Sequence, residues 1–271
     1  MKPVSKVGLA GLAVLICILE ISCGDKMETK SIPAKSSASA CVQLRAELER
    51  MSCGGTVAND WGELAQYRDA DAQIGQATPG LPRIVLIGDS ITFGWPGLGA
   101  KGHFEGVDVF NRGITGQLTA QMLLRFRQDV VDLHPQVVVI LGGSNDIERV
   151  MPPALPVIEG NLASMAQLAK ANGIRAVISS IPPVHDSGHD ERGNPLKQTR
   201  THPSQQIREL NDWLRKFAKE NGCVFVDYYS ALIDRDGFLK KEYSEDGLHP
   251  NAAGYAVMEP LVVQAIKEAA H

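Results

Sequence analysis

The stretch RIVLIGDSITFGW, residues 83–95, carries the strongest indication of the fold. Its first part, RIVLIG (83–88), is an almost unbroken apolar run of strand length. Such a run is typical of a strand that is covered on both faces, as in a parallel sheet. A Gly-Asp-Ser follows at once. Ser90 is then either a turn residue or helix cap, or a nucleophile, and this stretch alone does not separate the two interpretations.

The rest of the chain alternates between strand-like and helix-like patterns. Further strands are predicted at VDVFNRG (107–113), QVVVILGG (136–143), GIRAVISS (173–180) and CVFVDY (223–228). Helical periodicity covers 119–133, 158–173, 203–222 and 251–270, where Pro260 predicts a kink or a break. A helical N-terminal addition is predicted around 60–74. This alternation predicts an α/β protein with right-handed crossovers.

Composition narrows the class of protein. The chain has 271 residues, of which 44% are hydrophobic and 21% charged, and its net charge is −4. A chain of this length and composition can bury a sizeable core, so we expect a globular protein. The net negative charge and the lack of a long basic run argue against a nucleic-acid partner.

The N-terminus has the layout of a secretory signal peptide. Lys2 and Lys6 precede an apolar run of thirteen residues, 7–19, and a spanning helix needs about 20. LEISCGD (19–25) resembles a bacterial lipobox with Cys23 as the lipidated residue, although Glu20 stands where that motif has an aliphatic side chain. We therefore predict a signal peptide over 1–22, a flexible tether over 23–40 and one folded domain over 41–271. The protein would be periplasmic or on the cell surface, either free or tethered to the membrane through Cys23. An uncleaved, weakly inserted anchor is the alternative.

Export would place the cysteines in an oxidising compartment, where disulfides form. In an oxidising compartment Cys41 and Cys53 could close a small loop. Cys223 opens an apolar run and is interpreted as a buried, unpaired thiol. There is no C-x-x-C pair in the chain, so nothing favours a thiolate zinc site.

Chemistry-bearing residues follow the predicted strands. In open α/β sheets the functional residues gather at the carboxyl ends of the strands. Ser90, Gly113 and Asn145 lie at or just after the ends of three predicted strands, and Asp246 and His249 follow the last strand after a further loop. We expect these five residues at one edge of the sheet.

Four short segments carry a resemblance to a known family. GDSI (88–91), NRGITG (111–116), GGSND (142–146) and DGLHP (246–250) resemble, in order and spacing, the four blocks of the SGNH hydrolases, also called the GDSL esterase/lipase family. The match covers residues 83 to about 266, and GDSI departs from GDSL at one position. The resemblance implies a flavodoxin-like three-layer α/β/α sandwich with a parallel five-stranded sheet. It also implies a serine esterase that needs no metal or cofactor.

The residue types fit that chemistry. Ser90 needs a base to become a nucleophile, and His249 can take and return its proton. Asp246 lies three residues earlier, which lets both side chains point the same way and the carboxylate orient the imidazole. The resemblance implies an oxyanion hole made by the N–H groups of Ser90 and Gly113 and by the side-chain amide of Asn145. Taken singly, each of these residues has an ordinary structural interpretation. Asp246 would be a turn residue, His249 a helix-start residue, Gly113 a tight bend and Asn145 an Asx turn.

One loop offers a weaker candidate site. HDSGHDERGNPLKQTRTHP (185–203) contains His185, Asp186, His189 and Asp190, which could suggest a metal ion. Its Gly-rich, polar composition instead favours a mobile loop that walls the substrate site. The low apolar content of the loop does not indicate a lid for long acyl chains.

These observations predict an exported serine esterase that forms an acyl-Ser90 intermediate. The blocks resemble those of the platelet-activating-factor-acetylhydrolase-like and carbohydrate-acetylesterase-like branches, which implies short acyl groups, acetyl above all. The alcohol half would belong to a carbohydrate, a lysophospholipid or a small alcohol. The alternative is a catalytically inactive, glycan-binding surface lipoprotein on the same fold. A flavin-binding protein is a third interpretation, which GDSITFG fits only faintly.

Overall fold

The computed structural model describes residues 60–75, 79–98, 102–104, 106–149, 155–189 and 193–271. The chain divides into two units, Met1–Met51 and Ser52–His271, and all described residues belong to the second. The predictions of a signal peptide, of a tether with lipidated Cys23, and of a Cys41–Cys53 disulfide therefore lie outside the described residues.

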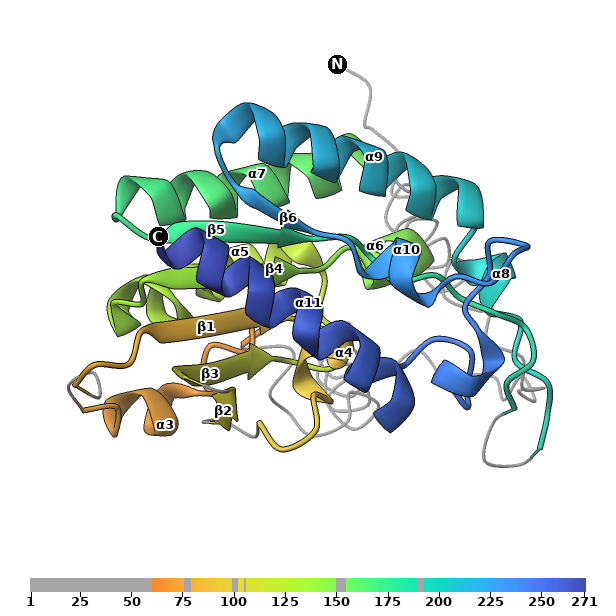
Figure 1. Ribbon diagram of the computed structural model, residues 1–271, viewed down its shortest axis with the longest axis horizontal. Coiled ribbons are helices and arrows are strands. Elements are labelled where there is room, and N and C mark those ends of the chain that lie inside the picture. Colours follow the sequence, from red (N-terminus) through yellow and green to blue (C-terminus); the bar gives the residue numbers. More distant parts are fainter. Residues whose placement is uncertain (1–59, 76–78, 99–101, 105, 150–154, 190–192) are drawn as a thin grey trace, which may run out of the picture. The chain divides into compact units, whose positions relative to one another are not determined.

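A single sheet of six strands forms the centre of the described part (Figure 1). The strands are β1 (Arg83–Gly88), β2 (Gly102–Phe104), β3 (Val107–Gly113), β4 (Val137–Leu141), β5 (Arg175–Ser179) and β6 (Val224–Val226), in the spatial order β2-β3-β1-β4-β5-β6. β3, β1, β4, β5 and β6 pair in parallel, which confirms the predicted five-stranded parallel sheet. The additional strand β2 pairs antiparallel with β3 at the edge. With three residues, β2 is too short to show a periodic pattern in the sequence.

Helices connect the strands. They are α3 (Arg68–Ala72), α4 (Ser90–Phe93), α5 (Thr119–Asp129), α6 (Ser144–Arg149), α7 (Leu155–Ala171), α8 (Gln198–Thr201), α9 (Ser204–Asn221), α10 (Tyr228–Leu232) and α11 (Ala252–Ala270), with 3₁₀ turns η1 (Val131–Leu133) and η2 (Lys241–Tyr243). The helix predicted around 60–74 is limited to α3. The reason lies in Asp60, whose carboxylate accepts hydrogen bonds from the N–H groups of Leu64 and Ala65 and holds that segment in turns.

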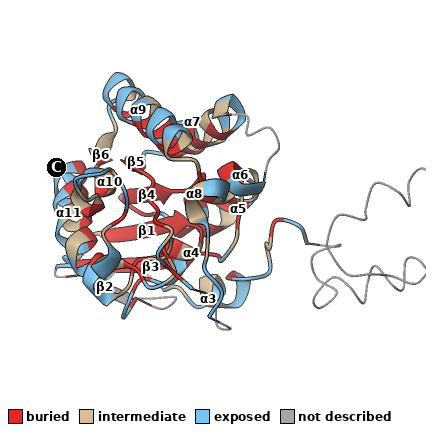
Figure 2. Cartoon of the chain, turned by 90° about the vertical axis from the view of Figure 1, so that its right-hand side faces the viewer, coloured by how far each residue is buried: buried red, intermediate tan, exposed pale blue. Residues whose placement is uncertain are grey.

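The sheet lies between two apolar cores, which gives the three layers that were predicted. Val85 and Ile87 of β1 point into the core under α5, α7 and α9, while Ile84 and Leu86 point into the core under α11. Figure 2 shows the buried strands in red between helices whose outer surfaces are exposed. The unbroken apolar run of β1 follows from this arrangement, because both faces of the strand are covered.

α11 is one continuous helix, so of the kink or break predicted at Pro260 the break does not occur. Pro260 cannot donate the helical hydrogen bond to the carbonyl of Ala256. The helix continues because Met258 and Val262, on either side of the proline, are both fully buried in the core, whereas Pro260 itself faces solvent. Burial of the apolar face outweighs the loss of one hydrogen bond.

Two further features of the described part bear on the predictions. Cys223 is a free thiol, as predicted, but it is only half-buried, and that burial raises its pKa. Among the described residues no helix is both long enough and apolar enough to cross a membrane.

The register of the parallel strands determines which residues meet. Gly88, the last residue of β1, lies opposite Gly113 of β3 and Leu141 of β4. Because these three strands end at the same level, the segments that follow them emerge at one edge of the sheet.

Candidate active site

Ser90 is the first residue of α4, directly after the turn that ends β1. Asp89 forms the N-cap of this helix: its Oδ1 accepts a hydrogen bond from the N–H of Ile91, 3.0 Å away. Burial raises the pKa of Asp89 to about 6. No described residue accepts a hydrogen bond from the N–H of Ser90. The turn therefore presents both the Ser90 hydroxyl and a free amide at the sheet edge.

Ser90, His249 and Asp246 form a continuous hydrogen-bonded chain. The Nε2 of His249 lies 2.9 Å from the Oγ of Ser90, and its Nδ1 lies 2.6 Å from Oδ2 of Asp246. The other carboxylate oxygen of Asp246 accepts hydrogen bonds from the N–H groups of Leu248 and His249, at 2.9 and 2.8 Å, and from the Oγ of Ser244 at 3.1 Å. The structure thus brings together the three residues predicted as a triad.

The pKa shifts of His249 and Asp246 are consistent with this hydrogen-bonded chain. The hydrogen bond to Asp246 raises the pKa of His249, although burial opposes the shift. For Asp246, burial alone would raise the pKa, but the hydrogen bonds from His249 and from the neighbouring backbone amides hold it well below its usual range. Asp246 is therefore ionised, and its charge stabilises a proton on the imidazole.

Gly113 does not occupy the predicted position in an oxyanion hole. Its N–H already donates to Oδ1 of Asn111, 2.8 Å away, and its carbonyl accepts from the hydroxyl of Tyr67. A Cβ at Gly113 would lie 2.1 Å from the backbone nitrogen of Phe93, so glycine is needed there to let α4 approach β3. The predicted role does not fit this structure, because the Gly113 amide already donates to Asn111.

A second glycine of the same block, Gly116, lines the cavity beside Ser90 instead. It lies in a turn that is closed by a hydrogen bond from the N–H of Gln117 to the carbonyl of Ile114. The φ of Gly116 is 78°, which is the conformation that the third residue of a type II turn requires. No described residue accepts a hydrogen bond from the Gly116 N–H. The NRGITG block held a signal for this residue, since a glycine suits that turn position.

Asn145, in the first turn of α6, has a half-buried side chain that lines the same cavity. Its Nδ2 donates one hydrogen bond to the carbonyl of Gln117, 3.1 Å away. An amide nitrogen carries two hydrogens, so one remains for a ligand. Asn145 therefore lies at the predicted edge of the sheet, and its role in an oxyanion hole stays a prediction.

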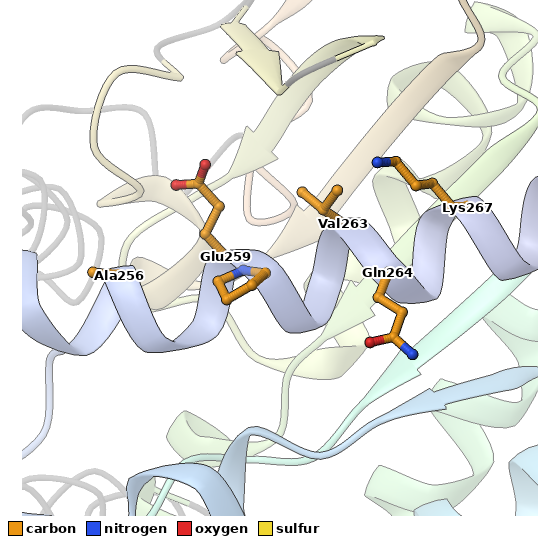
Figure 3. Close-up of a pocket in the computed structure, with 6 residues that line it drawn as sticks. Ala256, Glu259, Val263, Gln264 and Lys267 are labelled. Carbon is orange, nitrogen blue, oxygen red and sulfur yellow. The ribbon is translucent and has the colours of Figure 1, made fainter.

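The cavity at this edge has a volume of about 470 Å³. The segment after β5 contributes Pro195, Leu196, Lys197, Gln198, Arg200 and Thr201 to its wall, as predicted for this loop. The other lining residues are Ser90, Thr115, Gly116, Asn145, Glu148, Arg149, Leu248 and His249. Another hollow lies along the outer side of α11, lined by Ala256, Glu259, Pro260, Val263, Gln264 and Lys267 (Figure 3). Its described lining comes from one helix and holds no nucleophile with an adjacent base, unlike the cavity that Ser90 and His249 line.

Comparison with known proteins agrees with the site. A sequence model of the GDSL-like Lipase/Acylhydrolase family matches residues 86–257, which include the whole triad. The chain belongs to this family. As a GDSL acylhydrolase it is a carboxylic ester hydrolase.

Relatives of this GDSL hydrolase span most of its folded part. It is 33% identical over 199 residues to an arylesterase of Vibrio mimicus, covering 68% of this chain and 88% of that one. It is 37% identical over 187 residues to esterase TesA of Pseudomonas aeruginosa, covering 63% and 80%. The crystal structure of a GDSL-like lipase from Bacteroides thetaiotaomicron is also similar, with 34% identity, a TM-score of 0.66 and coverage of 77% of this chain and 98% of that one.

Two of the loop residues considered as metal ligands, His185 and Asp186, accept hydrogen bonds from other groups of the GDSL hydrolase. Nδ1 of the buried His185 accepts from the N–H of Ser187, and both carboxylate oxygens of Asp186 bind Thr199. His189 lies in a short bridge to Pro195, and Asp190 lies outside the described residues. These contacts hold the loop against the cavity.

A buried arginine that was not predicted from the sequence supports the turn that carries Ser90. Arg125 of α5 is fully buried and donates to the carbonyl of Gly88 at 3.0 Å, to Asp129 at 2.9 Å and to the Oε1 of Gln117 at 2.6 Å. It thereby links the end of β1 to the turn that contains Gly116. The only sequence signal was an arginine four residues before an aspartate, a spacing that more often marks an exposed helix face.

Proposed function

We propose that this GDSL hydrolase cleaves short-chain carboxylic esters, acetyl esters above all, through an acyl-Ser90 intermediate. The observation that carries the proposal is the hydrogen-bonded chain from Ser90 through His249 to Asp246. In the first step Oγ of Ser90 attacks the ester carbonyl while Nε2 of His249 takes its proton. Asp246 stabilises the imidazolium, which then protonates the departing alcohol.

The second step regenerates the enzyme. His249 takes a proton from a water molecule, the resulting hydroxide attacks the acyl carbonyl, and the C–O bond to Ser90 breaks. The proton returns to Oγ, and the carboxylic acid leaves. Both tetrahedral intermediates need hydrogen-bond donors aimed at their oxyanion. The free N–H of Ser90, the free N–H of Gly116 and the second amide hydrogen of Asn145 serve this role in the proposal.

The lining of the cavity supports short acyl groups. Among its described residues only Pro195, Leu196 and Leu248 are large and apolar. A long acyl chain gains about 0.8 kcal/mol for each CH₂ that it buries, and these three side chains offer little surface for such burial. A carbohydrate, a lysophospholipid or a small alcohol remains as the alcohol half, and the arylesterase among the relatives fits the last of these.

The test is hydrolysis of p-nitrophenyl esters. The wild-type protein should cleave the acetate with a higher kcat/KM than the decanoate. Ser90→Ala should lower kcat by about 10⁴- to 10⁶-fold, and a fluorophosphonate probe should label only Ser90 in peptide maps. Full activity in Ser90→Ala, or a label on another residue, would refute the mechanism. No turnover by the wild type, together with retained glycan binding, would support the inactive glycan-binding alternative.

Export is part of the same proposal. It is supported by Lys2 and Lys6 before the apolar run 7–19, and by the lipobox-like LEISCGD with Cys23. Labelling of expressing cells with a radioactive fatty acid tests the tether. The label should appear on the wild-type protein and be lost in Cys23→Ser, and equal labelling of both would refute lipidation at Cys23.

A further inference from the structure

Three cationic side chains line the cavity that contains Ser90 and His249. Arg149 ends α6, Lys197 directly precedes α8, and Arg200 lies within α8. One carboxylate, Glu148, lines the same cavity. With His249 neutral, the described lining has an excess of two positive charges. The chain as a whole has a net charge of −4, so the cavity has the opposite sign to the rest of the protein.

One of the three cations is already engaged within the protein. An Nη of Arg149 donates to the carbonyl of Gly116 at 2.8 Å, and its Nε lies 3.6 Å from the carboxylate of Glu148. Arg149 thus holds the turn of Gly116 and balances the charge of Glu148. The two remaining positive charges belong to Lys197 and Arg200.

Lys197 and Arg200 have exposed side chains with no ion-pair partner among the described residues. The charge of Lys197 contributes to lowering the pKa of Asp186. However, both oxygens of Asp186 already accept hydrogen bonds from Thr199, and Asp186 is not part of the described lining. The two cations therefore remain available to a ligand in the cavity.

We infer that Lys197 and Arg200 bind an anionic group on the alcohol half of the ester substrate. This inference rests on the proposed esterase function of the same site. An acetyl group carries no ionisable atom, so the anion must belong to the alcohol half. A guanidinium matches carboxylate, phosphate and sulfate oxygens in a bidentate geometry, and an ammonium adds a point charge. The substrate class is an acyl ester of an alcohol that carries one of these anionic groups.

The experiment uses the full chain and two acetyl esters of the same shape, 4-acetoxybenzoate and 4-acetoxybenzamide. The ratio of their kcat/KM values is compared between variants, so the different intrinsic reactivities of the two esters cancel. Lys197→Gln and Arg200→Gln should each lower kcat/KM for the benzoate about 2- to 5-fold more than kcat/KM for the benzamide, mainly through KM. Arg200→Glu should lower the ratio further, and added salt should reduce the ratio of the wild type.

Lys216→Gln is the matched control, because Lys216 is an exposed lysine on α9 that does not line the cavity. It should leave both rates at the wild-type values. A ratio that Arg200→Glu and salt leave unchanged would overturn the anion site while the esterase function stands. Failure of the wild type to hydrolyse either acetyl ester would instead overturn the proposed function.

Discussion

Replacing Asp246 with asparagine tests how the carboxylate acts on His249. In the native site one oxygen of Asp246 accepts three hydrogen bonds, two of them from the backbone N–H groups of Leu248 and His249. The other oxygen accepts from Nδ1 of His249. Backbone N–H groups only donate, so the asparagine oxygen must stay at the first position. The NH₂ group of the asparagine then faces Nδ1.

That orientation forces the wrong tautomer on His249. An NH₂ group only donates, so Nδ1 must lose its hydrogen and accept, and the proton moves to Nε2. Nε2–H faces Ser90 and cannot take the proton of its hydroxyl. Turning the amide around would sacrifice the hydrogen bonds to the oxygen, each worth about 0.5–1.5 kcal/mol, and leave two N–H groups facing a donor. We expect Asp246→Asn to lower kcat about 10⁴-fold, which corresponds to about 5.4 kcal/mol.

The assay is kcat for p-nitrophenyl acetate, with the thermal unfolding midpoint measured on the same samples. Ser244→Ala is the matched control: it removes one of the three donors to the same oxygen but keeps the charge, and its kcat should fall less than tenfold. If Asp246→Asn retains kcat within tenfold of wild type while folded, then the carboxylate does not set the tautomer and the reasoning fails.

Three further perturbations have expected outcomes. Arg125→Met leaves Asp129 buried without its charge partner, so the free energy of unfolding in urea should fall by about 3–5 kcal/mol. A loss below about 1 kcal/mol would contradict this role. Adding Asp129→Leu to Arg125→Met should recover part of the lost stability. Asn145→Ala should lower kcat for p-nitrophenyl acetate about 10²- to 10³-fold with little change in KM, and an effect confined to KM would exclude it from the oxyanion hole. The pKa of His249 is raised above 6.5 and only the neutral imidazole accepts the serine proton, so the acid limb of kcat/KM against pH should have its midpoint above 6.5; a midpoint below 6.5 would contradict the hydrogen bond to Asp246.

Local patterns in the sequence were sufficient to predict the five parallel strands and the main helices. β1 and β3 have the bounds that the sequence predicted, and the apolar run after Arg83 in β1 reflects the cover on both faces of that strand. A second rule predicted that Ser90, Asn145 and the Asp246–His249 pair lie at one edge of the sheet, because parallel strands end together. Ser90 and His249 are 159 residues apart, yet the shared sheet edge and the family resemblance together predicted that they meet.

The tertiary structure decided which amides and charges are available. Whether Gly113 or Gly116 has a free N–H depends on which acceptor reaches each amide. Asn111 binds the first, and a turn with positive φ exposes the second. The burial of Arg125 and the continuity of α11 through Pro260 depend in the same way on partners from distant segments. The sequence by itself therefore determined the class of fold and the catalytic residue types. Only the packed structure determined which donors are free at the cavity, because hydrogen-bond partners and burial are set by contacts far apart in the chain.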